Sequence, residues 1–127
     1  MPYVTQEEAL NLPFLDLDPL AGRFGQAPWR AALVGSPALR VTLLHWAPGY
    51  ATIPHFHPVA EEIFLVISGR ASFAIGDEPE REVGPGELVL AKRGELHTIR
   101  VPAGAPLTLL AAVAPNEDRP DETIEPA

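Results

Sequence analysis

Short hydrophobic runs, separated by turns rich in glycine and proline, fill most of this chain. Several runs alternate hydrophobic and polar positions, which is typical of strands with one buried face. The runs predict nine strands, at residues 29–34, 39–47, 53–57, 62–68, 71–75, 81–83, 87–90, 97–101 and 107–114. Many short strands at roughly even spacing predict an all-β sandwich or barrel.

The region before the first predicted strand has a different character. Thr5-x-x-Glu8 is a capping-box pattern before Ala9-Leu10, so it predicts one short helix over residues 6–11. Prolines and glycines then recur, which predicts an irregular arm. We therefore divide the chain into an N-terminal helix and arm (1–28), a single barrel domain (29–114) and an acidic, flexible tail (115–127).

Alternation within the second predicted strand assigns its two faces. Arg40 and Thr42 are expected to face water. The residues expected to face inward are Leu39, Val41, Leu43 and His45.

The run that begins at Glu62 is apolar on both faces. A strand covered on one side alone should alternate, so its second face needs a cover. Ile63, Leu65 and Ile67 are therefore expected to lie under the N-terminal arm or against a second subunit.

Composition limits the classes of function. A length of 127 residues suits one domain, and a net charge of −8 argues against a nucleic-acid partner. No apolar run reaches the length of a membrane span, and the first residues do not resemble a secretory signal. The chain has no cysteine, so it has no disulfide and no thiolate metal site. A cytoplasmic location is expected, with no membrane partner.

Three of the four histidines fall into one spaced pattern. It reads Gly49-x5-His55-x-His57-x4-Glu62-x6-Gly69, followed by Gly86-x7-Gly94-x2-His97. On a strand, residues two apart point to the same face, so His55 and His57 are expected to lie side by side. Imidazole nitrogens and a carboxylate oxygen are ligands for divalent first-row metals.

Together the two halves resemble the paired signature of the cupin family, G-x5-H-x-H-x3,4-E-x6-G and G-x5-P-x-G-x2-H-x3-N. The resemblance extends from about residue 41 to residue 114. The first half matches at every position, whereas the second departs at Lys92, where the family usually has Pro, and at Val101, where it usually has Asn. The chain is thus identified as a member of the small single-domain cupins.

The resemblance implies a double-stranded β-helix, the jelly-roll barrel of cupins, with a metal site inside it. The implied metal ligands are His55, His57, Glu62 and His97. Glu61 also satisfies the family spacing. Glu62 is favoured because six residues separate it from Gly69 and because alternation places it on the face of Phe64 and Val66. The resemblance also implies a homodimer.

The expected cofactor is one divalent ion, and the ligand types admit iron, manganese, nickel, cobalt, copper or zinc. The first hypothesis is a metal-dependent oxygenase or related oxidoreductase that acts on a small organic molecule. One alternative is a non-catalytic barrel that binds or senses a small ligand. A further alternative is a metal-dependent isomerase, decarboxylase or lyase, because fold and ligands do not fix the reaction.

His45, the fourth histidine, has two interpretations. It is either a packed residue with one hydrogen bond or a general acid/base beside the metal. Tyr50, Phe64 and Ile99 have two interpretations as well, either residues that line the pocket or ordinary core residues. Arg93 and Arg100 are expected to face solvent, which leaves few cations inside the barrel and argues against a phosphorylated sugar as substrate.

Overall fold

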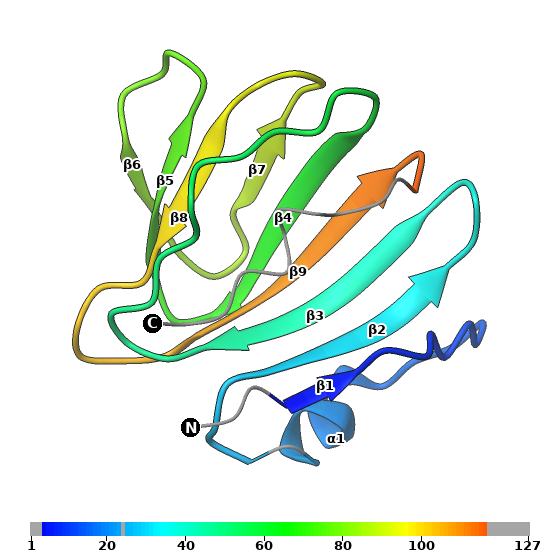
Figure 1. Cartoon of the computed structure of the whole chain (residues 1–127). Coiled ribbons are helices and arrows are strands. Elements are labelled where there is room, and N and C mark those ends of the chain that lie inside the picture. Colours follow the sequence, from blue (N-terminus) through cyan, green and yellow to red (C-terminus); the bar gives the residue numbers. More distant parts are fainter. Residues whose placement is uncertain (1–3, 24, 117–127) are drawn as a thin grey trace.

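The computed structural model describes residues 4–23 and 25–116, and this part of the chain consists mainly of strands (Figure 1). The elements are β1 (Val4–Gln6), α1 (Leu17–Gly22), β2 (Trp29–Gly35), β3 (Arg40–Trp46), β4 (Glu61–Ser68), β5 (Ala71–Ile75), β6 (Arg81–Val83), β7 (Leu88–Ala91), β8 (His97–Arg100) and β9 (Leu107–Ala114). They form a larger sheet in the order β1-β2-β3-β9-β4-β7 and a smaller sheet in the order β6-β5-β8. The all-β prediction is confirmed.

The main core lies between the two sheets. Every strand from β3 to β9 contributes apolar side chains to it, because alternate residues of each strand point inward. Its members include Leu44, Trp46, Phe64, Val66, Phe73, Val83, Ala91, Ile99, Leu107 and Leu109. The barrel interior is therefore a packed core into which polar side chains enter at one place, described below.

The predicted strand at residues 53–57 does not form as a regular strand. Its segment runs beside β8 and makes only isolated bridges, Ala51 to Arg100 and His55 to His97. Pro54 has no backbone N–H to donate to a ladder. Earlier in the segment, the side-chain hydroxyl of Thr52 accepts a hydrogen bond from the Ile99 N–H of β8 at 3.0 Å. The segment thus lies along the barrel wall without regular pairing.

The prediction of a helix over residues 6–11 is wrong. Thr5 and Gln6 belong to β1, which pairs in parallel with β2, so the capping-box pattern is not used. The helix lies later, at α1, where Leu20 is buried against Trp29 and Leu33. A short helix N-terminal to the barrel is present, at a different position from the one expected.

The arm packs on the outer face of β2 and β3 and creates a second core there. Leu10, Leu15 and Leu17 of the arm and α1 contact a cluster that includes Leu43 of β3. Asn11 holds the arm in place, since its side-chain oxygen accepts the Gly35 N–H at 2.8 Å. Both faces of β3 are therefore buried.

This second core reverses the faces predicted for β3. Thr42 is buried and lies on the inner face with Leu44 and Trp46, not in water. Leu43 faces the arm, and His45 stacks on Trp29 on that same outer face. The sequence pattern was misleading because the strand is covered on both sides.

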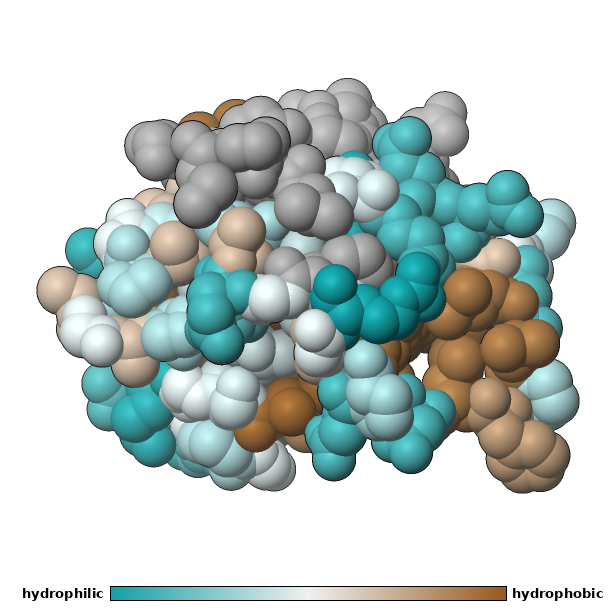
Figure 2. All heavy atoms as spheres, turned by 90° about the horizontal axis from the view of Figure 1, so that it is seen from below, coloured by the Kyte–Doolittle hydropathy of each residue, from teal (hydrophilic) through white to brown (hydrophobic). Residues whose placement is uncertain are grey.

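The arm does not cover the outer face of β4. Ile63, Leu65 and Ile67 remain 37%, 36% and 38% exposed. Of the two covers predicted for them, the arm is therefore wrong, and a second subunit stays a prediction. Figure 2, seen from the side of α1, shows hydrophobic surface gathered toward one side of a largely hydrophilic face. Leu12 and Phe14 of the arm are themselves exposed.

The C-terminal end of the described chain returns to the turn between β2 and β3. The backbone N–H of Asn116 donates to the Pro37 carbonyl at 3.1 Å, and its side chain donates to the Ser36 carbonyl at 2.9 Å. The rest of the predicted tail, residues 117–127, lies outside the described residues. No helix within the described residues is long and apolar enough to cross a membrane.

Candidate metal centre

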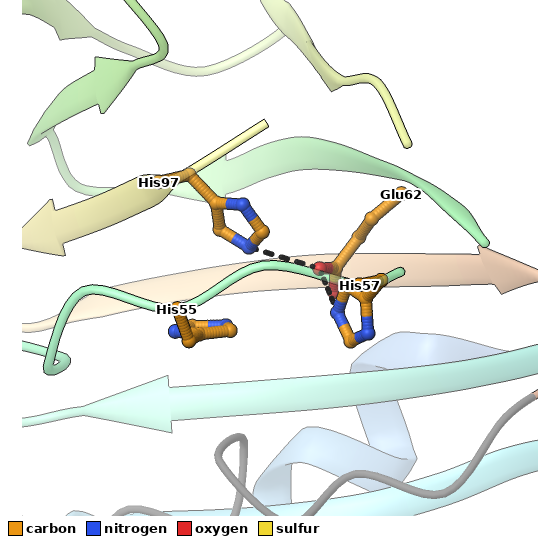
Figure 3. Close-up of side chains that lie close together, drawn as sticks. All are labelled: His55, His57, Glu62 and His97. Atoms are coloured by element: carbon orange, nitrogen blue, oxygen red, sulfur yellow. Dashed lines mark hydrogen bonds and ion pairs between the residues drawn. The ribbon is translucent and has the colours of Figure 1, made fainter. Parts of the chain in front are cut away.

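The four predicted metal ligands converge inside the barrel (Figure 3). His55 and His57 come from the segment between β3 and β4, Glu62 from β4, and His97 from the start of β8. One ligand atom of each residue lies within 4.8 Å of those of the other three. The residues are 7%, 5%, 2% and 1% exposed, respectively. They form a buried group that could hold a metal ion.

The local backbone fixes three of these side chains. His55 and His97 exchange backbone hydrogen bonds of 3.2 and 2.9 Å, which brings their rings to a centroid distance of 4.3 Å. The N–H of Gly94 donates to the His57 carbonyl at 2.9 Å. Gly94 has φ +78°, a conformation that glycine adopts without steric cost. The framing glycine of the motif thus ties the histidine segment to the loop before β8.

Backbone carbonyls determine which nitrogen of two histidines carries the proton. His55 Nδ1 lies 2.9 Å from the Ile53 carbonyl, and His97 Nδ1 lies 3.1 Å from the Glu95 carbonyl. A carbonyl only accepts, so each Nδ1 must be the N–H. In a neutral ring with this tautomer the Nε2 atom keeps its lone pair, as in metal-ligating histidines oriented by a second hydrogen bond.

The site contains an unsatisfied polar atom that a cation would satisfy. His97 Nε2 is buried and has no hydrogen-bond partner among the described residues. It lies 3.3 Å from Glu62 Oε1. Buried polar atoms are rarely left without a partner. Together with the imidazole and carboxylate donors, this orphaned nitrogen fits a metal ion bound among the four side chains.

The protonation states also fit a metal. Burial by itself raises the pKa of Glu62, but its contacts with His57 and His97 outweigh burial and lower the pKa to about 2. The closest of these contacts is the 3.0 Å hydrogen bond from His57 Nε2 to Glu62 Oε1. Burial lowers the pKa of His55. Both shifts favour the forms that bind metal, namely an ionised Glu62 carboxylate and a neutral His55 imidazole.

Glu61 and Glu62 lie on opposite faces of β4. Glu62 points into the cluster, whereas Glu61 is exposed. The choice of Glu62 over its neighbour therefore agrees with the strand's alternation.

His45 lies away from the cluster. It is buried on the arm side of the larger sheet, where its ring stacks on Trp29 with centroids 5.5 Å apart and an angle of 9°. His45 Nδ1 lies 2.8 Å from the hydroxyl of Thr108. Of the two interpretations of His45, the structure agrees with the packed residue, because the arm covers the outer face of β3 on which His45 lies. We do not propose it as a catalytic residue.

The two departures from the family signature have local explanations. The Lys92 N–H donates to the Glu95 carboxylate at 2.9 Å, and the Glu95 N–H donates to the Lys92 carbonyl at 2.9 Å. A proline at position 92 would have no N–H for the first of these bonds, so this turn uses a backbone donor that the family's usual proline lacks. Val101 is buried in the main core.

A cavity lies beside the cluster, with His55 and Glu62 in its wall. The other lining residues are Arg30, Arg40, Thr42, Leu44, Trp46, Thr52, Phe64, Ile99, Ala111 and Val113. Phe64 and Ile99 thus line the pocket, whereas Tyr50 packs on Trp46 within the core.

Sequence reasoning missed the two cavity arginines. Alternation around Trp29 offered a signal for Arg30, which lies between two residues of the arm-side core, Trp29 and Ala31, and therefore points to the opposite face. Arg93 and Arg100 are exposed, as expected.

Residues 42–113 match the family model described as the Cupin domain. A 46-residue stretch is 41% identical to dimethylsulfoniopropionate lyase DddQ of Ruegeria pomeroyi, and it covers 36% of this chain and 22% of that protein.

Solved structures show the same fold. The crystal structure of DddQ from Ruegeria pomeroyi superposes with a TM-score of 0.65 at 26% identity, covering 77% of this chain and 52% of that one. The TT1209 protein from Thermus thermophilus gives 0.73 at 24% identity, covering 84% and 100%. A Klebsiella pneumoniae protein with a double-stranded β-helix domain gives 0.69 at 24% identity, covering 82% and 90%. The jelly-roll prediction is confirmed.

Proposed function

This chain belongs to the cupin family, and we propose that it is a metal-dependent enzyme that acts on a small organic molecule. The observation that carries the proposal is the buried cluster of His55, His57, Glu62 and His97 with a cavity beside it. A divalent metal held by these residues would supply Lewis-acid or redox chemistry to a molecule in the cavity. The apolar part of the wall would shield that molecule from water.

The ion itself is proposed only as one divalent first-row metal. Three imidazole nitrogens and one carboxylate oxygen accept iron, manganese, nickel, cobalt, copper or zinc. The protein's part is to hold the ligands in their binding states, with Glu62 ionised and the Nδ1 protons of His55 and His97 held by backbone carbonyls.

Two classes of reaction are proposed for this site, and the requirement for O₂ separates them. The match to a lyase supports bond cleavage without an oxidant, although this chain spans about half of the DddQ chain in its crystal structure. The donor set supports an oxygenase or related oxidoreductase, because it suits redox-active metals.

A non-catalytic ligand-binding barrel is the second candidate function. Apart from the cluster itself, the cavity wall within residues 4–23 and 25–116 has no carboxylate, imidazole or phenol side chain. Such groups usually transfer protons in catalysis, so their absence from this wall favours binding over turnover.

Turnover measurements in air and under nitrogen test the proposal. Protein loaded in turn with each candidate metal would be incubated with small carboxylates, enols and dimethylsulfoniopropionate, with His57→Ala as the control. Product without O₂ supports the lyase, and metal-dependent O₂ uptake supports the oxygenase. Saturable binding without turnover for any metal supports the ligand-binding barrel. Failure of every metal to bind would overturn the lyase and the oxygenase proposals.

We also propose a homodimer, formed through the uncovered face of β4 and β7. In the register of these strands Ile63 lies opposite Leu90 and Leu65 opposite Leu88, and all four are exposed. β7 is the edge strand of the larger sheet, so this apolar face continues to the edge. Apolar patches of this kind commonly mark contacts between proteins. The cytoplasmic location stays a prediction.

A further inference from the structure

Two arginines line the cavity that contains His55 and Glu62, namely Arg30 of β2 and Arg40 of β3. Strand register explains their position. Arg30 lies opposite Leu44, which lines the same cavity, whereas the neighbours of Arg30 face the arm. Arg30, Arg40 and Thr42 also line a second, outer hollow that includes Gln6 and Asn116. The arginines therefore lie between the metal-binding cluster and the outer surface.

Arg30 differs from the arginines that lie in or directly before strands of the smaller sheet. Arg70 pairs with Glu82 at 2.9 Å, Arg81 with Glu87 at 3.1 Å, and Arg100 with Glu80. Arg30 is partly buried, and its guanidinium makes no hydrogen bond or ion pair with any residue of the described chain. Arg40 has another interaction of its own, so Arg30 is the residue that needs an acceptor.

The described residues of the cavity wall offer Arg30 no free carboxylate with which to pair. Glu62 is the one carboxylate among the described residues of its wall, and it is already engaged by His57 and His97. A guanidinium presents five N–H donors in a planar fork, which matches a carboxylate in a bidentate geometry. The remaining wall is mainly apolar and suits a short carbon skeleton.

We propose that Arg30, assisted by Arg40, binds the carboxylate of a small organic acid whose other end reaches the cluster of His55, His57, Glu62 and His97. The inference rests on the proposed function only in treating this acid as the substrate. It names the substrate class, and it corrects the expectation that the barrel offers few cations.

Calorimetric titration with propionate, succinate and glutarate, and with inorganic phosphate for comparison, tests this subsite. Each acid would be compared with its neutral amide, on both metal-loaded and metal-free protein. We expect the wild type to bind at least one acid more tightly than its amide. Arg30→Gln should weaken that binding about tenfold or more, in line with the loss of charge-assisted hydrogen bonds, without changing metal content. The metal-free series separates binding at Arg30 from coordination to the metal.

Two further variants control the experiment. Arg70→Gln removes a surface arginine that pairs with Glu82 and should leave acid binding unchanged. Arg30→Lys keeps the charge but loses the planar fork, so it should bind with intermediate affinity and serves if Arg30→Gln fails to fold.

Several outcomes would overturn the inference. These are equal affinity for acid and amide, no binding of any acid by the wild type, unchanged affinity in Arg30→Gln, or tighter binding of inorganic phosphate than of every carboxylate. Arg30-dependent binding without turnover would leave the subsite intact and remove only the enzyme proposal. Unimpaired turnover in Arg30→Gln would leave the enzyme proposal intact and remove the proposed subsite.

Discussion

The Nε2 atom of His97 lies 3.3 Å from Oε1 of Glu62, and both atoms are buried. The nitrogen forms no hydrogen bond with a described residue, so the pair is close without being satisfied. An unsatisfied buried polar atom costs roughly 1–3 kcal/mol. A bound cation would be coordinated by the lone pair of His97 and would offset the negative charge of Glu62. The pair therefore predicts that this site binds a metal ion.

His57→Ala should strongly reduce metal content, since it removes one of four ligands. Metal added at about one hundred times its Kd stabilises a folded protein by about 2.7 kcal/mol, and the variant should lose most of this gain. Elemental analysis and thermal melting with and without metal measure both effects. His45→Ala is the matched control, because His45 lies on the other side of the sheet and should leave metal content unchanged. Full metal occupancy in His57→Ala would remove the site assignment.

Glu62→Gln should weaken metal binding far more than Glu61→Gln. The first substitution removes the buried negative charge that His57 and His97 contact, whereas the second changes an exposed side chain. Titration with cobalt, followed by its visible absorption, gives the two affinities. The opposite order would transfer the ligand role to Glu61.

The sequence was sufficient for the fold and for the convergence of the four polar residues. The jelly roll and the four-residue ligand set were implied by the resemblance to the cupin signature. The strand runs and turns follow local rules, such as glycines at positions where the chain adopts positive φ, as at Gly69 and Gly94. The same rules distinguished Glu62 from Glu61, because alternation along β4 is regular.

The sequence was insufficient where tertiary packing overrides a local pattern. β3 is covered on both sides, so its faces could not be assigned from polarity, and this misplaced His45 and Thr42. The capping-box pattern at Thr5 failed because β1 pairs with β2. These pairings join residues far apart in the chain, and no local rule contains them.

His45 should make stability depend on pH. Burial lowers the pKa of His45 from its ordinary 6.5, and a hydrogen bond with the Gln26 backbone offsets part of this. Below pH 6.5 the unfolded chain takes up a proton that the folded protein does not, so the free energy of unfolding falls until the folded pKa is reached. In urea unfolding of metal-free protein, His45→Gln should lose less stability than the wild type as the pH falls through this window. His55 acts in the same direction, so some dependence should remain. Equal losses in both proteins would contradict the prediction.

Leu65→Glu should shift the protein from dimer to monomer. A charge in the middle of the uncovered face, opposite Leu88, would have to be desolvated in the proposed interface. Light scattering coupled to size-exclusion chromatography reports the mass. Ile53→Glu is the control, because Ile53 is also exposed but lies outside the strands of that face. A dimer that persists in Leu65→Glu would place the interface elsewhere.

Gly69→Ala should destabilise the protein more than Gly86→Ala. The two glycines have nearly equal φ values of +84° and +82°, so a side chain meets the same backbone strain at both, roughly 1–2 kcal/mol. At Gly86 an added Cβ would meet no atom within 4 Å, whereas at Gly69 it would collide with the carbonyl oxygen of Pro106 and lie 3.1 Å from Leu107 Cα. Those atoms are backbone at the start of β9 and cannot rotate away as a side chain could. The difference between the two variants in urea unfolding therefore isolates the close approach of the β4–β5 turn to β9. Equal destabilisation would mean that the backbone at the start of β9 moves away from the added methyl group without lowering the free energy of unfolding.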